Sequence, residues 1–190
     1  MGKCSKTQCI FAHVVPQKGV DDDGNVIEEL KNDILWLGHS QVVVRSDNEP
    51  ALLRVVEKTV KALRASGGVD SATTEGSVPY DPQTNGIAAG AVRVIRGQFK
   101  ALLLGLERQI KGRVPLDHPA MAWLVQHSAY VSNARIVGPD GRTAHQRARG
   151  TTGTTTFLAF GETCRYKARP ADTRPGPKSK ELELRDGDGV

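Results

Sequence analysis

Hydrophobic residues recur along the chain at the spacings of an α/β domain. The run Gln41–Arg45 contains three successive valines without polar alternation, which is typical of a strand buried on both faces. Apolar residues at helical spacing predict a helix over Val26–Leu37, ended by Gly38. A further helix is expected, with Asn48 as its cap and Pro50 in its first turn, because apolar residues follow at three- and four-residue steps: Leu52, Val55, Val56, Val60 and Leu63.

The same patterns predict elements on either side of this central part. They are a strand over Gln8–Val15, a loop over Gly67–Thr84 with a short strand near Ala72–Glu75, and helices over Asn85–Lys111 and Pro119–Ala134. Trp123 lies among the apolar positions of the last helix and is expected in the core. Strands that alternate with helices favour an α/β fold.

Composition changes at Gly150. A threonine-rich run follows, and the last part of the chain is rich in proline and charge. We therefore expect a main domain over residues 1–150, a short β segment over 151–167 and a disordered, basic tail over 168–190.

The charge balance is moderately basic. Lysine and arginine outnumber aspartate and glutamate by 26 to 21, which gives a net charge of +5 at pH 7. Such an excess suits a polyanionic partner such as nucleic acid, although many ordinary proteins are equally basic.

The chain has neither an apolar run of membrane-spanning length nor a hydrophobic N-terminal signal segment. We therefore expect an intracellular protein of the nucleus or cytoplasm that is not secreted and has no membrane partner. Cys4, Cys9 and Cys164 lack the spacing of a zinc site and are expected to be reduced thiols without a special role.

Asp47 is the residue most indicative of function. It follows the valine-rich strand and precedes a helix, so we expect it at the carboxyl end of the sheet, where α/β folds place their sites. The alternative is a structural role in capping the next helix.

Two motifs together resemble the integrase catalytic core of retroviral type, specifically that of copia-type retrotransposon polyproteins. They are RSDNEPAL at residues 45–52 and PQTNGIAAGAVR at residues 82–93, and weaker similarities extend over nearly the whole chain. The resemblance implies an RNase H-like mixed sheet flanked by helices, DNA integration as the activity, Mg²⁺ or Mn²⁺ as the cofactor and DNA as the partner.

The resemblance also implies site residues, and the chain departs from it twice. Asp47 matches the family's second catalytic aspartate and is the expected metal ligand, but Ala89 stands where the family has its catalytic glutamate. The family's first aspartate lies upstream of the segment that matches Gln8–Val15. We therefore expect a truncated core that lacks its first strand or strands, with marginal stability or self-association into a homo-oligomer as a result.

These departures bear directly on the chemistry. Enzymes of this type hold two Mg²⁺ ions roughly 4 Å apart with carboxylate ligands, and an alanine methyl group supplies neither a ligand nor a charge. We therefore expect strand transfer to be lost. Glu75 and Asp81 precede the long helix and are the acids that could replace the glutamate. Glu49 is expected to interact with the dipole of the helix that follows it, and Asp21–Asp23 are expected to lie in a solvated turn.

Basic residues on the long helix are the candidate DNA contacts. Arg93, Arg96 and Lys100 lie four, seven and eleven residues after Ala89 and share one helical face with it. This face favours binding of DNA phosphates, and a solvated outer face is the alternative. A second cluster, which is expected to serve surface solubility, consists of Arg142, Arg147 and Arg149.

Three hypotheses are open at this point. The first is an integrase-type domain that binds DNA non-specifically without transferring strands. The second is a non-enzymatic binding module or transposon-derived remnant, and the third is a hydrolase of the same fold that uses Glu75 or Asp81.

Overall fold

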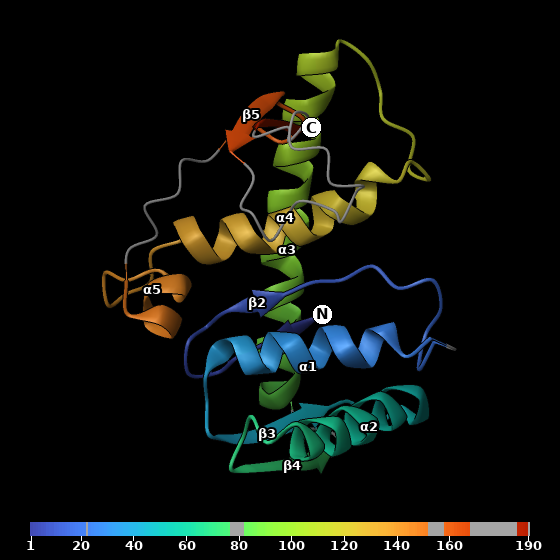
Figure 1. Cartoon of the computed structure of the whole chain (residues 1–190), viewed down its shortest axis with the longest axis vertical. Helices are drawn as coiled ribbons and strands as arrows, with labels where there is room; N and C mark the ends of the chain where they lie inside the picture. Colours follow the sequence, from blue (N-terminus) through green and yellow to red (C-terminus); the bar gives the residue numbers. More distant parts are fainter. Residues whose placement is uncertain (22, 77–81, 152–157, 168–185, 190) are drawn as a thin grey trace, which may run out of the picture.

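The structure is a computed structural model that describes residues 1–21, 23–76, 82–151, 158–167 and 186–189. Helices and short strands alternate over residues 25–110, as expected for an α/β protein, and two further helices follow in succession (Figure 1). The elements are β1 (Gly2–Lys3), β2 (Ile10–Phe11), α1 (Asn25–Leu37), β3 (Gln41–Ser46), α2 (Pro50–Ser66), β4 (Ser71–Gly76), α3 (Pro82–Ile110), α4 (Ala120–Arg135), α5 (Ala144–Arg149), β5 (Cys164–Lys167) and β6 (Asp186–Gly189).

A βαβ unit and α1 form one layer of the molecule. β3 and β4 pair in parallel with Gln41 opposite Ser71 and Ser46 opposite Gly76, and α2 connects them. Helix α1 ends at Gly38, whose φ of 69° is the left-handed conformation that glycine adopts without strain. The core of this layer consists of Ile34, Val56, Val60, Leu63 and Ala72, with Leu30, Leu35, Val42, Val44 and Val69 packed around them.

The prediction that β3 is buried on both faces is wrong. Burial alternates along the strand, and Val43 is 60% exposed. Among the described residues β3 has β4 as its strand partner, and α1 and α2 supply the core on one face of the pair. A run of valines specifies a strand, but coverage of its second face depends on elements that the run itself does not encode.

A second core lies between the N-terminal hairpin, α3 and α4. The strands β1 and β2 are antiparallel, and the core consists of Ile10, Ala12, Ala91, Ile95 and Ala129, with Val125 packed against it. The side chain of Asn133 in α4 binds the outer edge of β2. Its Oδ1 accepts a hydrogen bond from the Ile10 N–H at 2.8 Å, and its Nδ2 donates to the Ile10 carbonyl at 2.8 Å.

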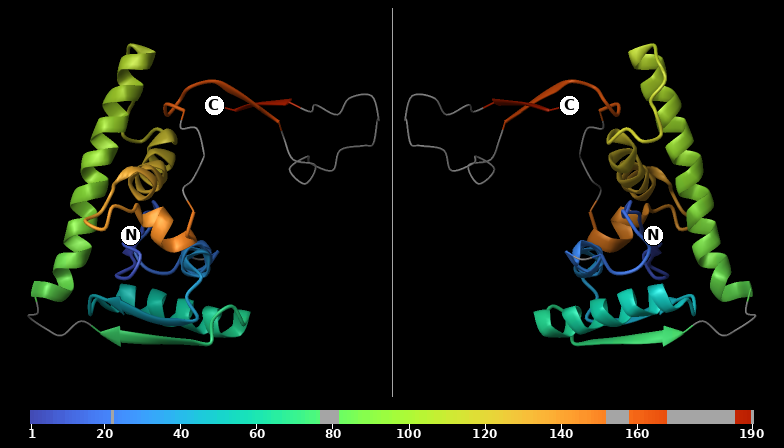
Figure 2. Two further views of the ribbon diagram at one scale, coloured as in Figure 1. Left: turned by 90° about the vertical axis from the view of Figure 1, so that its left-hand side faces the viewer. Right: turned by 90° about the vertical axis from the view of Figure 1, so that its right-hand side faces the viewer.

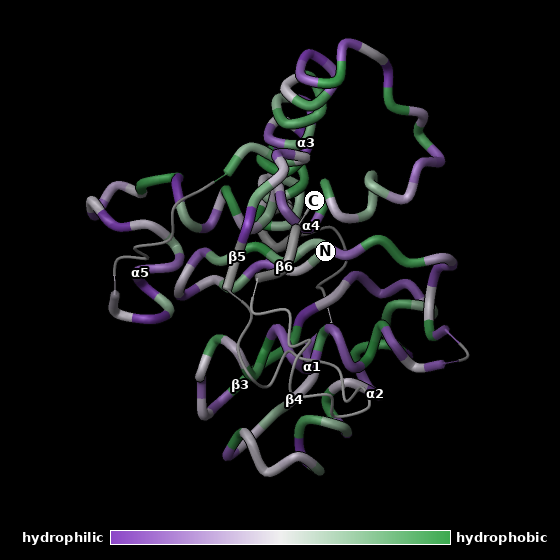
Figure 3. Tube along the Cα trace, turned by 45° about the horizontal axis from the view of Figure 1, so that its top comes forward, coloured by the Kyte–Doolittle hydropathy of each residue, from purple (hydrophilic) through white to green (hydrophobic). Residues whose placement is uncertain are grey.

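The long helix α3 runs past both the βαβ unit with α1 and the N-terminal hairpin, and α4 crosses it (Figures 1 and 2). Its trace alternates between hydrophobic and hydrophilic stretches (Figure 3), and its buried positions include Ala91, Ile95 and Leu106. The prediction that Trp123 of α4 lies in the core is wrong, because its side chain is 70% exposed and the neighbouring Leu124 is fully buried instead. The helical period placed Trp123 one position away from the face that packs.

Helix α2 begins at Pro50, one residue later than expected, and its N-cap is Glu49, which makes no side-chain capping hydrogen bond. The expected cap, Asn48, lies one residue earlier. The described residues form three separate two-stranded sheets, so the mixed α/β class is confirmed while the single RNase H-like sheet stays a prediction.

β5 and β6 are antiparallel, and residues 168–185 of the predicted disordered tail lie outside the described residues. In the part of the chain that the structure describes, no helix combines the length and apolar character needed to cross a bilayer.

Candidate functional site

Asp47 lies where the sequence places it, directly after β3. Because β3 and β4 are parallel, their carboxyl ends lie at one edge of the pair, next to the N-terminal end of α3 (Figure 2). Asp47 is exposed, and so is Ala89 in the early part of α3. The carboxylate and the start of the basic helix therefore lie at the same side of the molecule.

The side chain of Asn48 lies close to Gly76, the last residue of β4. A Cβ atom at Gly76 would lie 3.0 Å from the Asn48 side-chain oxygen, which is closer than side chains normally approach. Glycine at position 76 is therefore what lets Asn48 reach across the carboxyl end of β4.

Two of the acids around Asp47 are held in ion pairs. Glu49 Oε1 lies 2.6 Å from Lys18 Nζ, and Glu75 Oε2 accepts a hydrogen bond from Arg45 Nε at 2.8 Å across the strand pair. Glu75 and Arg45 are register partners on the exposed face of β3 and β4. Asp81, the other proposed substitute for the missing glutamate, lies outside the described residues.

The donor set at this edge does not fit a pair of magnesium ions. Asp47 offers one carboxylate, Ala89 offers a methyl group, and Glu75 is neutralised by Arg45. Within the described ranges no three His, Cys, Asp or Glu side chains come close enough to hold a metal ion together.

The basic stripe of α3, defined as Arg93, Arg96 and Lys100, is exposed along its whole length. None of the three cations forms an ion pair with a described residue. From Pro82 to Leu106 the helix contains no acidic residue, so no acid on α3 lies within six residues of the stripe. The rise of an α-helix sets the distance along the axis from Ala89 to Lys100 at about 16 Å.

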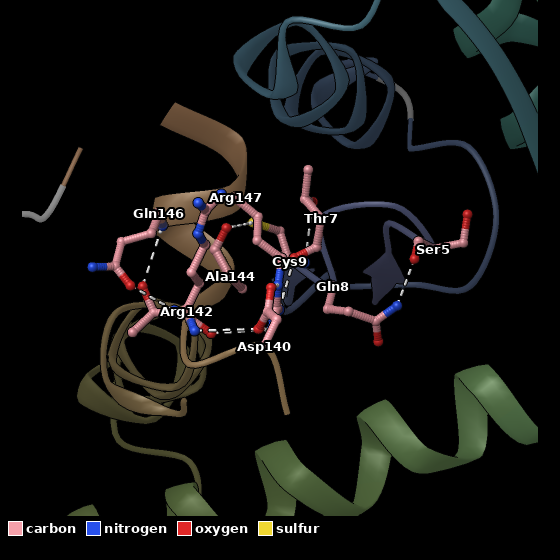
Figure 4. A network of polar contacts seen from close by, with 10 residues as sticks. Ser5, Thr7, Gln8, Cys9, Asp140, Arg142, Ala144, Gln146 and Arg147 are labelled. Atoms are coloured by element: carbon pink, nitrogen blue, oxygen red, sulfur yellow. Dashed lines mark hydrogen bonds and ion pairs between the residues drawn. The ribbon is translucent and has the colours of Figure 1, made fainter. Parts of the chain in front are cut away.

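The second arginine cluster has a structural role that the expectation of surface solubility missed. Arg147 binds Asp140 through Nε at 2.8 Å and Nη2 at 2.5 Å, and this pairing holds the pKa of Asp140 well below its usual range. Arg149 lies over the Trp36 ring at 5.1 Å and donates to the Trp36 carbonyl at 3.3 Å. These two side chains fasten α5 to the rest of the protein (Figure 4 shows Arg147).

The acidic turn before α1 also differs from the expectation of a solvated loop. The carboxylate of Asp21 accepts hydrogen bonds from the backbone N–H groups of Asn25 at 3.0 Å and Val26 at 3.2 Å. Asp21 therefore satisfies two free N–H groups at the start of α1, and its negative charge interacts favourably with the helix dipole there. Asp22 lies outside the described residues, and Asp23 is exposed.

No family model matches the chain, and no curated protein shows significant similarity to it. Among solved structures the chain is similar to the crystal structure of the catalytic core domain of BIV integrase. The identity is 20%, the match covers 71% of this chain and 74% of that chain, and the TM-score is 0.43. The resemblance to copia-type polyproteins stays a prediction from the motifs.

Two groupings of polar side chains could not be found from the sequence. Cys4 and His39 approach each other across 35 positions, with Sγ and Nε2 3.4 Å apart. His13 lies between α1 and α4, with its Nε2 atom 2.7 Å from Asp33 Oδ2. Neither pair has a local spacing signal, because tertiary packing alone brings the partners together.

Proposed function

We propose that this chain is an integrase-type DNA-binding domain that binds the phosphate backbone without transferring strands. The single observation that supports it best is the basic stripe of α3. Three exposed cations without described counterions lie on one face of a helix whose first 25 residues contain no acid.

Phosphate binding follows from the geometry of this stripe. Side chains three and four residues apart project from neighbouring positions of a helix, so the three cations form a row along the axis. Such a row can follow consecutive phosphates of a nucleic-acid backbone, and arginine and lysine side chains supply the N–H donors. Because the contacts are to phosphates, we expect little dependence on base sequence.

The proposed loss of strand transfer rests on the residues near Asp47. A two-metal reaction needs several carboxylates around the ions, and the side chain at position 89 is a methyl group. The nearest described substitute, Glu75, is bound by Arg45. The edge therefore binds DNA in this proposal but provides no metal-dependent chemistry.

Salt dependence of binding tests the phosphate contacts. Each neutralised phosphate contributes about 0.9 to the slope of log affinity against log salt, so three contacts give a slope of about −2.7 and roughly a 40-fold weakening between about 50 and about 200 mM salt. The variant with Arg93→Gln, Arg96→Gln and Lys100→Gln should lose most of this slope. Measurement of binding to a short duplex by fluorescence anisotropy gives both values.

A matched control is available on α2. Arg54, Lys58 and Lys61 are exposed and share one face at the same kind of spacing, so their replacement by glutamine removes an equal charge from another surface. The control variant should keep the wild-type slope within about one phosphate contact. Equal loss of slope in both variants, or no binding by the wild-type protein at low salt, would leave the transposon-derived remnant as the better explanation.

Strand transfer into supercoiled plasmid with Mg²⁺ or Mn²⁺ tests the second half of the proposal. We expect no product from the wild-type protein. Product that disappears in Asp47→Asn would show that a working metal site exists. If Glu75→Gln abolished it as well, the result would favour a hydrolase or transferase that uses that acid.

A further inference from the structure

A backbone hydrogen bond joins the two N-terminal cysteines at the end of the β1–β2 hairpin. In this antiparallel pair Gly2 lies opposite Phe11 and Lys3 opposite Ile10, so the next pair in register is Cys4 and Cys9. The Cys4 N–H donates to the Cys9 carbonyl at 2.9 Å, which continues the ladder. The Cys4 carbonyl accepts from the Gln8 N–H at 2.9 Å, and the Cys9 N–H donates to Thr7 Oγ1 at 3.3 Å, so Gln8 and Cys9 both lie opposite Cys4 in a bulge. A disulfide needs Cα atoms roughly 4.4–6.8 Å apart, a range that residues joined by a backbone hydrogen bond across two strands meet.

Cys4 has a base beside its sulfur atom. His39, in the turn between α1 and β3, places Nε2 at 3.4 Å from Cys4 Sγ, and the Thr7 N–H donates to the same sulfur at 3.4 Å. Both Cys4 and His39 are only half-buried, so small molecules can reach the thiol. A neighbouring imidazole that accepts the thiol proton is the usual means by which a cysteine becomes a nucleophile.

Cys9 has the opposite environment. Its side chain is fully buried, and its thiol donates to the Ala144 carbonyl at 3.3 Å (Figure 4). Burial raises the pKa of the Cys9 thiol, which keeps it protonated and unreactive toward reagents in solution. The pair therefore consists of one accessible thiol with a base and one protected thiol opposite it.

We propose that Cys4, His39 and Cys9 form a redox-responsive dithiol site, in which a hydroperoxide converts the two thiols to a Cys4–Cys9 disulfide. In the first step the Cys4 sulfur attacks the peroxide, His39 takes the thiol proton and passes it to the leaving oxygen, and Cys4 becomes a sulfenic acid. The sulfur of Cys9 then displaces hydroxide from the sulfenic acid, and the Cys9 proton leaves with it as water. With hydrogen peroxide, two thiols and one oxidant molecule yield one disulfide and two water molecules.

The disulfide also changes a tertiary contact. Cys9 must turn from the Ala144 carbonyl toward Cys4, which removes the hydrogen bond between the residue before β2 and the first residue of α5. The neighbouring contact from Arg147 Nη1 to the Thr7 carbonyl, at 3.4 Å, comes from the same hairpin loop. Oxidation of the two cysteines therefore changes the contacts of α5, at the end of the second core.

Tryptic peptide mapping tests the site directly, because cleavage at lysine and arginine separates the three cysteines. Cys4 falls in residues 4–6, Cys9 in residues 7–18 and Cys164 in residues 150–165. After one equivalent of hydrogen peroxide and alkylation of the remaining thiols, peptide 4–6 should be linked to peptide 7–18, and Cys164 should be alkylated. Links between molecules, or oxidation of Cys4 without a link to Cys9, would overturn the proposal.

The rate of Cys4 modification tests the role of His39. Cys164 is half-buried like Cys4 and serves as the reference thiol within the same sample. A base within hydrogen-bond reach typically contributes a large factor, so in His39→Gln the rate at Cys4, measured relative to Cys164, should fall at least about 10-fold from its wild-type value. An unchanged relative rate would exclude the imidazole as the base.

A second variant separates the two chemical steps. In Cys9→Ser the sulfenic acid at Cys4 has no thiol to react with, and a dimedone adduct should accumulate on peptide 4–6. In the wild-type protein this adduct should be largely lost because the disulfide forms first. Equal dimedone labelling of both proteins would show that Cys9 does not take part.

Discussion

The edge of β2 is completed by a side chain instead of a strand, and this contact provides a sharp test of the fold. Asn133 in α4 binds both the N–H and the carbonyl of Ile10 with hydrogen bonds of 2.8 Å. Ile10 and Asn133 are both buried, so few water molecules can replace the lost groups. In Asn133→Ala the two backbone groups of Ile10 lose their partners.

The size of the effect follows from the cost of buried unpaired groups. An unsatisfied buried backbone donor or acceptor costs about 1–3 kcal/mol, so two such groups cost roughly 2–6 kcal/mol. The higher helix propensity of alanine offsets about half a kcal/mol of this loss. A water molecule that enters the vacated space and bonds to the Ile10 groups would reduce the loss further. We therefore expect a loss of about 2–4 kcal/mol in the free energy of unfolding, a large fraction of a typical total of about 5–15 kcal/mol.

Urea unfolding followed by far-UV circular dichroism measures this loss. The matched control is Ser132→Ala, because Ser132 is the preceding residue of the same helix, is also buried, and has a hydroxyl without a hydrogen-bond partner among the described residues. Its removal should be neutral or slightly stabilising. Asn133→Asp should be at least as harmful as Asn133→Ala, since a carboxylate cannot donate to the Ile10 carbonyl. A value for Asn133→Ala within about 0.5 kcal/mol of that for Ser132→Ala would refute the reasoning.

Two further predictions concern pH and core packing. The hydrogen bond to the Asp33 carboxylate is the main cause that raises the pKa of His13 above 6.5, and Glu29 and Gln126 face the other ring nitrogen at 3.4 Å. Protonated His13 therefore stabilises the fold fully below pH 6.5, and this stabilisation is lost as the pH rises through the raised pKa of His13. The urea midpoint of the wild-type protein should fall over this pH interval, and that of His13→Gln should change less. In α4, Leu124→Ala should lower the free energy of unfolding by about 2–5 kcal/mol, whereas Trp123→Ser should change it by no more than about 0.5 kcal/mol. Thermal unfolding compares the two variants, and similar shifts in their melting temperatures would contradict the observed helix orientation.

The helices were largely determined by local sequence. Val26–Leu37 was expected to be a helix ended by Gly38, and the structure has α1 over Asn25–Leu37 with Gly38 in the left-handed conformation. The strand near Ala72–Glu75 was also found, as β4. Such elements depend on side chains a few positions apart and on glycine and proline at their ends, so they can be identified from one sequence. The placement of Asp47 after β3 followed for the same reason.

What lies against each face was decided only by the tertiary structure. The period of a strand or helix indicates which residues share a face, but contacts from distant segments decide which face is covered, as Val43 and Trp123 show. The hydrogen bonds of Asn133 to Ile10 span 123 positions, and the approach of His39 to Cys4 spans 35. These contacts arise because burial of apolar surface brings whole elements together, and the polar groups that meet on packing leave no pattern in the sequence around them.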